Sequence, residues 1–109
     1  LILGISFKEN CPDVRNSKVV DIVKEFSDIQ AKVDIFDPVV DVKQVEKEYN
    51  LKCLLREPEK GKYSAIILSV AHTEFIKLGY TNIKGFGKKT SVLYDVKGLF
   101  GKDLVDGRL

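Results

Sequence analysis

The sequence has 109 residues, 44% of them hydrophobic, which suits a domain that buries a core without disulfides or metal. The formal net charge is only +2, so the composition argues against a nucleic-acid partner and favours a small molecule or another protein. No apolar run approaches the roughly 18 residues needed to cross a bilayer, and no signal peptide opens the chain. We therefore expect a soluble, cytoplasmic protein.

Methionine is absent and the sequence begins inside an apolar strand pattern, which predicts one domain, residues 1–109, cut from a longer protein. The two cysteines, Cys11 and Cys53, form no C-x-x-C pair, and a lone histidine leaves too few ligands for a zinc site. We expect no bound metal. A nucleophilic Cys11 is the weaker interpretation of that residue, because no histidine close in sequence can act as its base.

The first half of the chain predicts two strands and two helices. In chain order these are a strand at residues 1–7, a helix from residue 18, a strand at 32–37 and a helix at 42–49. Ser17 or Asn16 can cap the first helix, and Asp41 can cap the second. The second strand stops at Asp37 because Pro38 cannot continue a ladder in the middle of a sheet.

The second half continues the alternation. We predict a short strand at 51–55, a charged loop at 56–62, a strand at 64–70, a short helix from Thr73, a glycine- and lysine-rich loop at 79–89, a strand at 90–96 and a polar turn at 106–108. Thr73 can cap its helix. His72 lies where a strand ends, so it can either touch a ligand or bond to a neighbouring loop, and the second interpretation is favoured.

This alternation predicts an α/β fold, a Rossmann-like three-layer sandwich with an open, mostly parallel sheet of about five to six strands. The carboxyl ends of parallel strands meet at one edge, where such folds bind ligands. Three cations follow strands and can converge there on one anion: Lys8, Arg15 and Lys97. Each of them can equally be an ordinary surface charge.

A dinucleotide site in this sheet is not supported. Gly4 in the first strand and Asp37 at the end of the second imitate the usual layout, but the intervening loop has no G-x-G-x-x-G. It carries the bulky Phe7, Lys8 and Pro12 instead, which keep the backbone away from a pyrophosphate. We favour a role for Asp37 in starting the turn at Pro38 over a contact with ribose.

Three separated motifs resemble one known family. Phe7-Lys8, followed at fixed spacing by Asp13, Arg15 and Ser17, is similar to the F-K-x-x-x-x-D-x-R-x-S signature of the C-terminal, UDP-binding domain of the UDP-glucose/GDP-mannose dehydrogenase family. Residues 71–75 and 94–98, Ala-His-Thr-Glu-Phe and Tyr-Asp-Val-Lys-Gly, resemble the branch that oxidises UDP-N-acetylhexosamines for surface polysaccharides. The resemblance covers nearly the whole chain.

The resemblance implies an NAD-dependent UDP-sugar 6-dehydrogenase that oxidises the C6 alcohol of its substrate to a carboxylate through a thiohemiacetal on a catalytic cysteine. UDP-N-acetylmannosamine or UDP-N-acetylgalactosamine is the implied substrate, although the sequence does not identify the amino-sugar. The NAD-binding domain and the catalytic cysteine would lie outside residues 1–109, so we expect these residues alone to be inactive. The complete enzyme would be a homodimer or a larger oligomer.

The resemblance also assigns roles position by position. Phe7 and Lys8 match the pair that contacts the UDP-sugar, and Arg15 matches the arginine that reaches NAD in the assembled enzyme. Lys97 lies where the family places a basic residue, often arginine, that helps to hold the substrate; lysine cannot make the bidentate contact. Asp13 and Ser17 are expected to shape the loop and cap the helix, and no catalytic residue is expected among residues 1–109.

Two other classes of protein are alternatives to this interpretation. A stand-alone nucleotide-binding regulatory module would bind NAD rather than UDP. A receiver-like signalling domain would need an acidic cluster around a phospho-acceptor aspartate after the first strand, and the sequence has none there.

Overall fold

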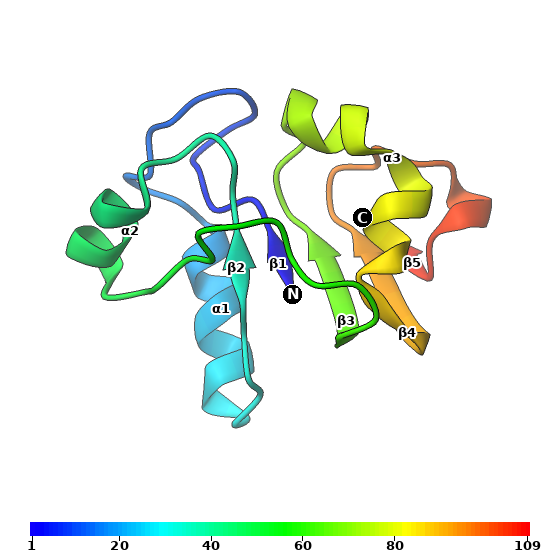
Figure 1. The fold of residues 1–109 in the computed structure, drawn as a ribbon. Coiled ribbons are helices and arrows are strands. Elements are labelled where there is room, and N and C mark those ends of the chain that lie inside the picture. Colours follow the sequence, from blue (N-terminus) through cyan, green and yellow to red (C-terminus); the bar gives the residue numbers. More distant parts are fainter.

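The computed structural model describes residues 1–109. It contains a single five-stranded sheet in which all neighbouring strands are parallel (Figure 1). The strand order is β2-β1-β3-β4-β5. The strands are β1 (Ile2–Leu3), β2 (Ile35–Phe36), β3 (Tyr63–Leu68), β4 (Gly87–Asp95) and β5 (Gly107–Arg108). The predicted Rossmann-like α/β fold is confirmed, and every strand ends at the same edge of the sheet.

Three α-helices connect the strands. They are α1 (Val19–Asp28), α2 (Val42–Tyr49) and α3 (Thr73–Gly85), and a short 3-10 helix, η1 (Lys102–Leu104), precedes β5. Figure 1 shows α1 beside β1 and β2, and α3 beside β4. None of these helices has the length and apolar character that a membrane span requires.

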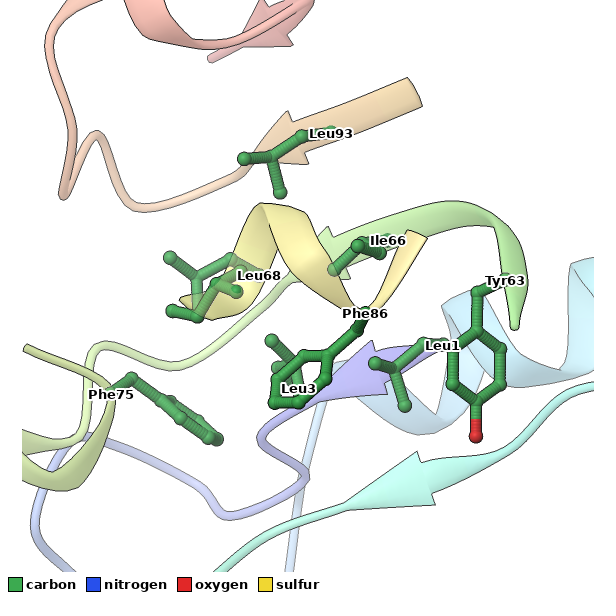
Figure 2. Close-up of a cluster of buried hydrophobic side chains, with 9 residues drawn as sticks. Leu1, Leu3, Tyr63, Ile66, Leu68, Phe75, Phe86 and Leu93 are labelled. Atoms are coloured by element: carbon green, nitrogen blue, oxygen red, sulfur yellow. The ribbon is translucent and has the colours of Figure 1, made fainter. Parts of the chain in front are cut away.

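The core consists of two apolar clusters, because successive side chains of a strand point to opposite faces of a sheet. In β1, Ile2 packs with the cluster that includes Val19 and Val23 of α1. Leu3, the next residue, belongs to the cluster that includes Phe75 and Ile83 of α3 (Figure 2). Helices on both faces thus explain why β1 and β3 read as nearly continuous apolar runs.

The predicted strand at residues 51–55 is wrong. This segment runs past β2 with one backbone hydrogen bond, from Leu54 N–H to the carbonyl of Ile35 at 2.7 Å. Its apolar residues divide between the two clusters: Leu51 and Cys53 pack on one and Leu54 on the other. The apolar pattern therefore reflects burial at the edge of the sheet rather than a strand.

The predicted loop at residues 79–89 is also wrong. Gly79, with φ 83° and ψ 164°, kinks α3, but the helix resumes and continues to Gly85. The composition of this stretch suggested a loop, yet Ile83 and Phe86 are fully buried and hold it against the sheet. Strand β4 begins at once, at Gly87.

Two smaller predictions at the termini also need correction. The turn predicted at residues 106–108 contains β5, whose register on β4 pairs Tyr94 with Gly107. The first strand ends at Leu3 rather than at residue 7, because Gly4 adopts a left-handed conformation with φ 94°. The chain therefore turns away from the sheet four residues earlier than predicted.

The helix caps are only partly as predicted. Asp41 accepts a hydrogen bond from Lys43 N–H at 2.9 Å and caps α2, as expected. Helix α1 has no side-chain cap, and the buried hydroxyl of Ser17 has no hydrogen-bond partner. The first N–H group of α3, that of Thr73, is bonded to the side chain of Asn10, a residue 63 positions earlier.

The carboxylate of Asp37, buried just after β2, fixes the strand ends. Its Oδ2 accepts hydrogen bonds from the N–H groups of Ile5 (2.7 Å) and Ser6 (3.3 Å) and lies 2.9 Å from His72 Nε2. Its Oδ1 accepts from Val39 N–H at 2.9 Å, which forms the turn at Pro38. One side chain therefore joins the ends of three strands, and the turn-forming interpretation of Asp37 is confirmed.

We predict that Gly4→Ala destabilises the fold by about 2–4 kcal/mol. An added Cβ would lie 2.6 Å from Val70 Cβ, and the left-handed φ disfavours any side chain. Gly101→Ala is the matched control, because its φ is −62° and nothing lies within 4 Å of its added Cβ, so its effect should stay below about 0.5 kcal/mol. Chemical denaturation measures both, and equal effects would contradict the prediction.

We predict that Asp37→Asn lowers stability by about 2–4 kcal/mol at pH 7. Burial raises the pKa of Asp37, but hydrogen bonds from His72, Ile5 and Val39 outweigh it and leave the pKa below its ordinary value. A lowered pKa stabilises the fold fully above about pH 4, and this stabilisation disappears as the pH falls through the folded-state pKa. The difference in melting temperature between wild type and variant should therefore shrink below pH 4.

The control for this prediction is Asp103→Asn, which changes an exposed carboxylate that makes no side-chain hydrogen bond. Its melting temperature should follow that of the wild type from pH 7 to pH 3. A wild-type advantage over Asp37→Asn that stayed constant below pH 4 would show that the charge on Asp37 is not what stabilises the fold.

Candidate functional site

The segment between β1 and α1, residues 4–17, lies at the carboxyl edge of the sheet, and we call its largely exposed part, residues 7–13, the FK loop. Figure 1 shows this segment rising beyond the end of β1, at the edge where α3 also begins. Phe7 is 56% exposed and Lys8 is also exposed. An exposed aromatic ring next to a cation can stack on a planar base and neutralise a phosphate.

Bonds within the FK loop fix its shape. Phe7 N–H donates to the carbonyl of Asp13 at 2.7 Å, which closes the loop at its base. The carbonyl of Lys8 accepts from Ser6 Oγ at 2.9 Å and from Cys11 N–H at 3.3 Å. The backbone that carries Phe7 and Lys8 is thus held in place while both side chains remain open to solvent.

Two residues of other elements anchor this segment, one near its carboxyl end and one at its middle. Tyr49 of α2 donates its hydroxyl hydrogen to the carbonyl of Val14 and accepts from Ser17 N–H at 3.3 Å. On the other side, Nδ1 of His72 accepts from Asn10 N–H at 2.9 Å. The apolar pattern of α2 predicts only a packing role for Tyr49; the signal that points to its hydroxyl is that a half-buried tyrosine needs a hydrogen-bond partner.

His72 is fully buried and therefore bonds to a neighbouring loop, as favoured from the sequence. Because Nδ1 accepts a hydrogen bond, the ring proton lies on Nε2 and is donated to Asp37 Oδ2 at 2.9 Å. Ser6 Oγ lies 3.3 Å from the same Nε2. Both ring nitrogens are occupied, so His72 has no free atom with which to bind a ligand.

Arg15 forms a forked ion pair with Asp13 on the surface. Its Nε lies 3.1 Å from Oδ1 and its NH2 nitrogen 3.1 Å from Oδ2 of the carboxylate. The side-chain hydrogen bond from Arg15, followed by its backbone N–H, lowers the pKa of Asp13, and the same side-chain bond raises the pKa of Arg15. The guanidinium is held in one orientation and is still 75% exposed.

A cavity of about 470 Å³ lies between the FK loop and α2. It is lined by Cys11, Pro12, Asp13, Val14, Arg15, Gln44, Lys47 and Glu48. Arg15 faces this cavity whereas Lys8 does not line it. Arg15 and Lys8, the two cations of the segment, therefore lie on different parts of the surface.

Lys97 follows β4 at the same edge of the sheet, is exposed and makes no ion pair. The turn that presents it is fixed by Asp95, whose Oδ2 accepts from Phe100 N–H at 2.8 Å. Arg108 of β5 lies against this turn, with NH1 3.4 Å from the carbonyl of Phe100. The place of Arg108 could not be predicted from local pattern, because it depends on the register of a two-residue strand.

The structure thus brings Lys8, Arg15 and Lys97 to one edge but not into contact. Arg15 pairs with Asp13 and lines the cavity beside α2, whereas neither Lys8 nor Lys97 lines that cavity. A single bound anion touching all three is not prearranged. The arrangement instead favours separate contacts along an extended ligand, or with more than one ligand.

Neither cysteine is activated. Burial, reinforced by the charge of Asp37, raises the pKa of Cys53 to about 11, which keeps its thiol protonated. Cys11 lines the cavity beside α2, and the only histidine has both nitrogens engaged elsewhere. No group of three or more histidine, cysteine or acidic side chains gathers where a metal could bind.

A larger cavity, of about 600 Å³, lies at the opposite edge, by the amino ends of β1, β3 and β4. Lys62 and the Tyr63 hydroxyl approach its one lining carboxylate, Asp34, at 3.6 and 2.7 Å. Ligands of open parallel sheets bind beyond the carboxyl ends of the strands, so size alone does not make this cavity the site. The candidate site is the carboxyl edge with the FK loop.

Comparison with known proteins relates nearly the whole chain to one family. The profile of the UDP-glucose/GDP-mannose dehydrogenase family, UDP binding domain, matches residues 1–102. UDP-N-acetyl-D-glucosamine 6-dehydrogenases of Salmonella typhi and Pseudomonas aeruginosa are 47% and 48% identical to this chain over 109 residues, which is all of it. Protein CapL of Staphylococcus aureus is 31% identical over 104 residues.

The chain spans only 25%, 26% and 24% of the length of these three relatives, although they cover 100%, 100% and 94% of it. The similarity is therefore to one part of each relative. On the profile match and on these identities, the chain belongs to the UDP-glucose/GDP-mannose dehydrogenase family, in its UDP-binding domain.

Proposed function

We propose that residues 1–109 are the C-terminal UDP-binding domain of a longer NAD-dependent 6-dehydrogenase that oxidises a UDP-N-acetylhexosamine to the uronic acid. Phe7 and Lys8 contact the UDP part of the substrate, and Lys97 adds a further positive charge. The observation that carries the proposal is the FK loop, a rigid loop that exposes Phe7 and Lys8 side by side at the ligand-binding edge of the sheet.

The residues present do not fit NAD as a ligand of this sheet. Asp37, at the position that would contact a ribose, is buried and accepts hydrogen bonds through both oxygens. Gly4 packs against Val70 instead of opening a glycine-rich turn. NAD is therefore held mainly by another domain, and Arg15 is the one residue proposed here to reach it.

Chemically, this domain would bind and orient its ligand rather than react with it. Lys8 offers a compact charge to a phosphate, while Phe7 offers a ring face to the uracil or the sugar. Arg15 is oriented by Asp13 and exposed, as a residue must be that reaches a group on another domain. The catalytic cysteine would lie outside these residues, and we propose that they are inactive alone.

Two relatives that cover the whole chain are UDP-N-acetyl-D-glucosamine 6-dehydrogenases by name. We therefore place UDP-N-acetylglucosamine first among the substrates to test, ahead of the mannosamine and galactosamine sugars expected from the sequence. A role in polysaccharide biosynthesis, in an oligomeric cytoplasmic enzyme, completes the proposal.

The first test is Lys8→Ala in the complete enzyme. The loss of one charged contact with a phosphate should raise the Kd for UDP about tenfold, equivalent to about 1.4 kcal/mol. The melting temperature should not change, because the side chain is exposed and makes no bond. Lys24→Ala, at an exposed lysine of α1, is the matched control. Titration calorimetry with UDP measures both, and equal Kd values in wild type and Lys8→Ala would exclude Lys8 from the site.

The second test is Arg15→Ala, assayed by NADH formation from NAD and UDP-N-acetylglucosamine. The wild-type enzyme should form about two NADH per sugar, since an alcohol is oxidised to a carboxylate. The variant should raise KM for NAD roughly tenfold and leave the Kd for UDP unchanged. A variant that weakened UDP binding and left KM for NAD unaltered would reverse the roles assigned to Arg15 and Lys8.

A further inference from the structure

We propose that His72 is a positioning residue for substrate binding: held by Asp37 in one tautomer, it fixes the FK loop through Asn10 and so sets the place of Phe7 and Lys8. This inference rests on the proposed function for its consequence, UDP binding. The lock itself, the chain of contacts from Asp37 through His72 to Asn10, is a property of the fold.

The first step is the orientation of the ring. Asp37 Oδ2 accepts the hydrogen bond from Nε2–H, so the ring proton stays on Nε2 and Nδ1 is an acceptor that points at the backbone of the loop. The ring is fully buried and packs on Phe75, with ring centroids 5.6 Å apart. Neither a flipped ring nor the other tautomer would preserve both hydrogen bonds, so the acceptor stays aimed at Asn10.

The second step is the link to the ligand-binding pair. His72 contacts the chain on both sides of it: Ser6 Oγ lies 3.3 Å from Nε2, and Asn10 N–H donates to Nδ1 at 2.9 Å. Ser6 Oγ in turn donates to the carbonyl of Lys8 at 2.9 Å. Residues 7–9 are thus a three-residue span between two residues that contact one buried ring: Asn10 donates to Nδ1, and Ser6 Oγ can accept only a second, weaker share of the Nε2–H that is donated to Asp37.

The third step is the conformation of Asn10 and the bonds that hold it. Its φ is 60°, a left-handed conformation that only a few residue types tolerate, and its Oδ1 accepts from Thr73 N–H at 2.8 Å. The side chain and the backbone of Asn10 thus both bond to adjacent residues, His72 and Thr73. Asn10, which is itself exposed, is joined in this way to the buried His72 at the end of the sheet.

His72 cannot act on the substrate directly, because no part of it is accessible and both nitrogens are engaged. A merely structural histidine would affect ligand binding only in proportion to its effect on stability. A positioning histidine would affect stability and ligand binding separately, because its bond to Asp37 stabilises the core and its bond to Asn10 fixes the loop.

Two substitutions divide these bonds. His72→Gln places an amide N–H group near the Nε2 position, which retains a donor to Asp37 and removes the acceptor for Asn10. His72→Asn places an amide oxygen near the Nδ1 position, which retains the acceptor for Asn10 and removes the donor to Asp37. We expect His72→Asn to have the lower melting temperature and His72→Gln to have the higher Kd for UDP, by about tenfold over wild type.

The experiment measures melting temperature, amide hydrogen exchange and calorimetric UDP affinity in the complete enzyme. In the wild type, the Asn10 amide should exchange roughly a hundredfold more slowly than the amide of exposed Glu9, and His72→Gln should lose most of that protection. If the Kd for UDP followed stability in the two variants, or did not change in His72→Gln, the positioning role would be overturned.

Two further outcomes keep the conclusions separate. If His72→Asn does not fold, wild type and His72→Gln decide the question, and an unprotected Asn10 amide in the wild type overturns the lock without any variant. If the wild-type enzyme binds no UDP, the proposed function fails and the consequence for binding fails with it, whereas Asn10 protection still reports on the lock.

Discussion

The carboxylate of Asp37 is the contact on which the ligand-binding edge depends. Parallel strands end together, but nothing in a backbone ladder fixes how the segments beyond their ends are arranged. Here a buried charge does so, accepting hydrogen bonds from the turn after β2, from the backbone after β1 and from His72 after β3. A buried carboxylate is stable only when such donors surround it, so the three segments constrain one another.

This constraint explains how a loop without glycine can hold the pair proposed to bind the ligand, Phe7 and Lys8. A glycine-rich turn brings its backbone to a phosphate, whereas the FK loop must bring side chains, and these need a backbone that does not move. Bonds within the loop, from Ser6 and Cys11 to the Lys8 carbonyl, supply part of that rigidity. His72 and Tyr49 supply the rest from opposite sides of the sheet edge.

Elements of the fold that local interactions determine could be predicted from the sequence, whereas features that depend on contacts between distant residues could not. Elements with a clear period, such as α1, α2 and β3, lie within a few residues of their predicted places because local burial determines them. The stretches 51–55 and 79–89 were predicted wrongly because packing, at Leu54 and at Phe86, outweighed local composition. Phe7, Lys8, Arg15 and Lys97 could be proposed as site residues from motifs, but the bond between Asn10 and His72 joins residues 62 apart and leaves no local pattern.

Asp37 marks the physical difference between this sheet and a dinucleotide-binding sheet. In the layout that the sequence imitates, the acid after the second strand is free to read a ribose; here the same position is turned inward and each oxygen is occupied. A buried carboxylate that joins the ends of three strands cannot also be an exposed contact for a cofactor. The sheet therefore keeps the topology of a nucleotide-binding fold, and under the proposed function its ligand is held by side chains beyond the strand ends, where Phe7 and Lys8 lie.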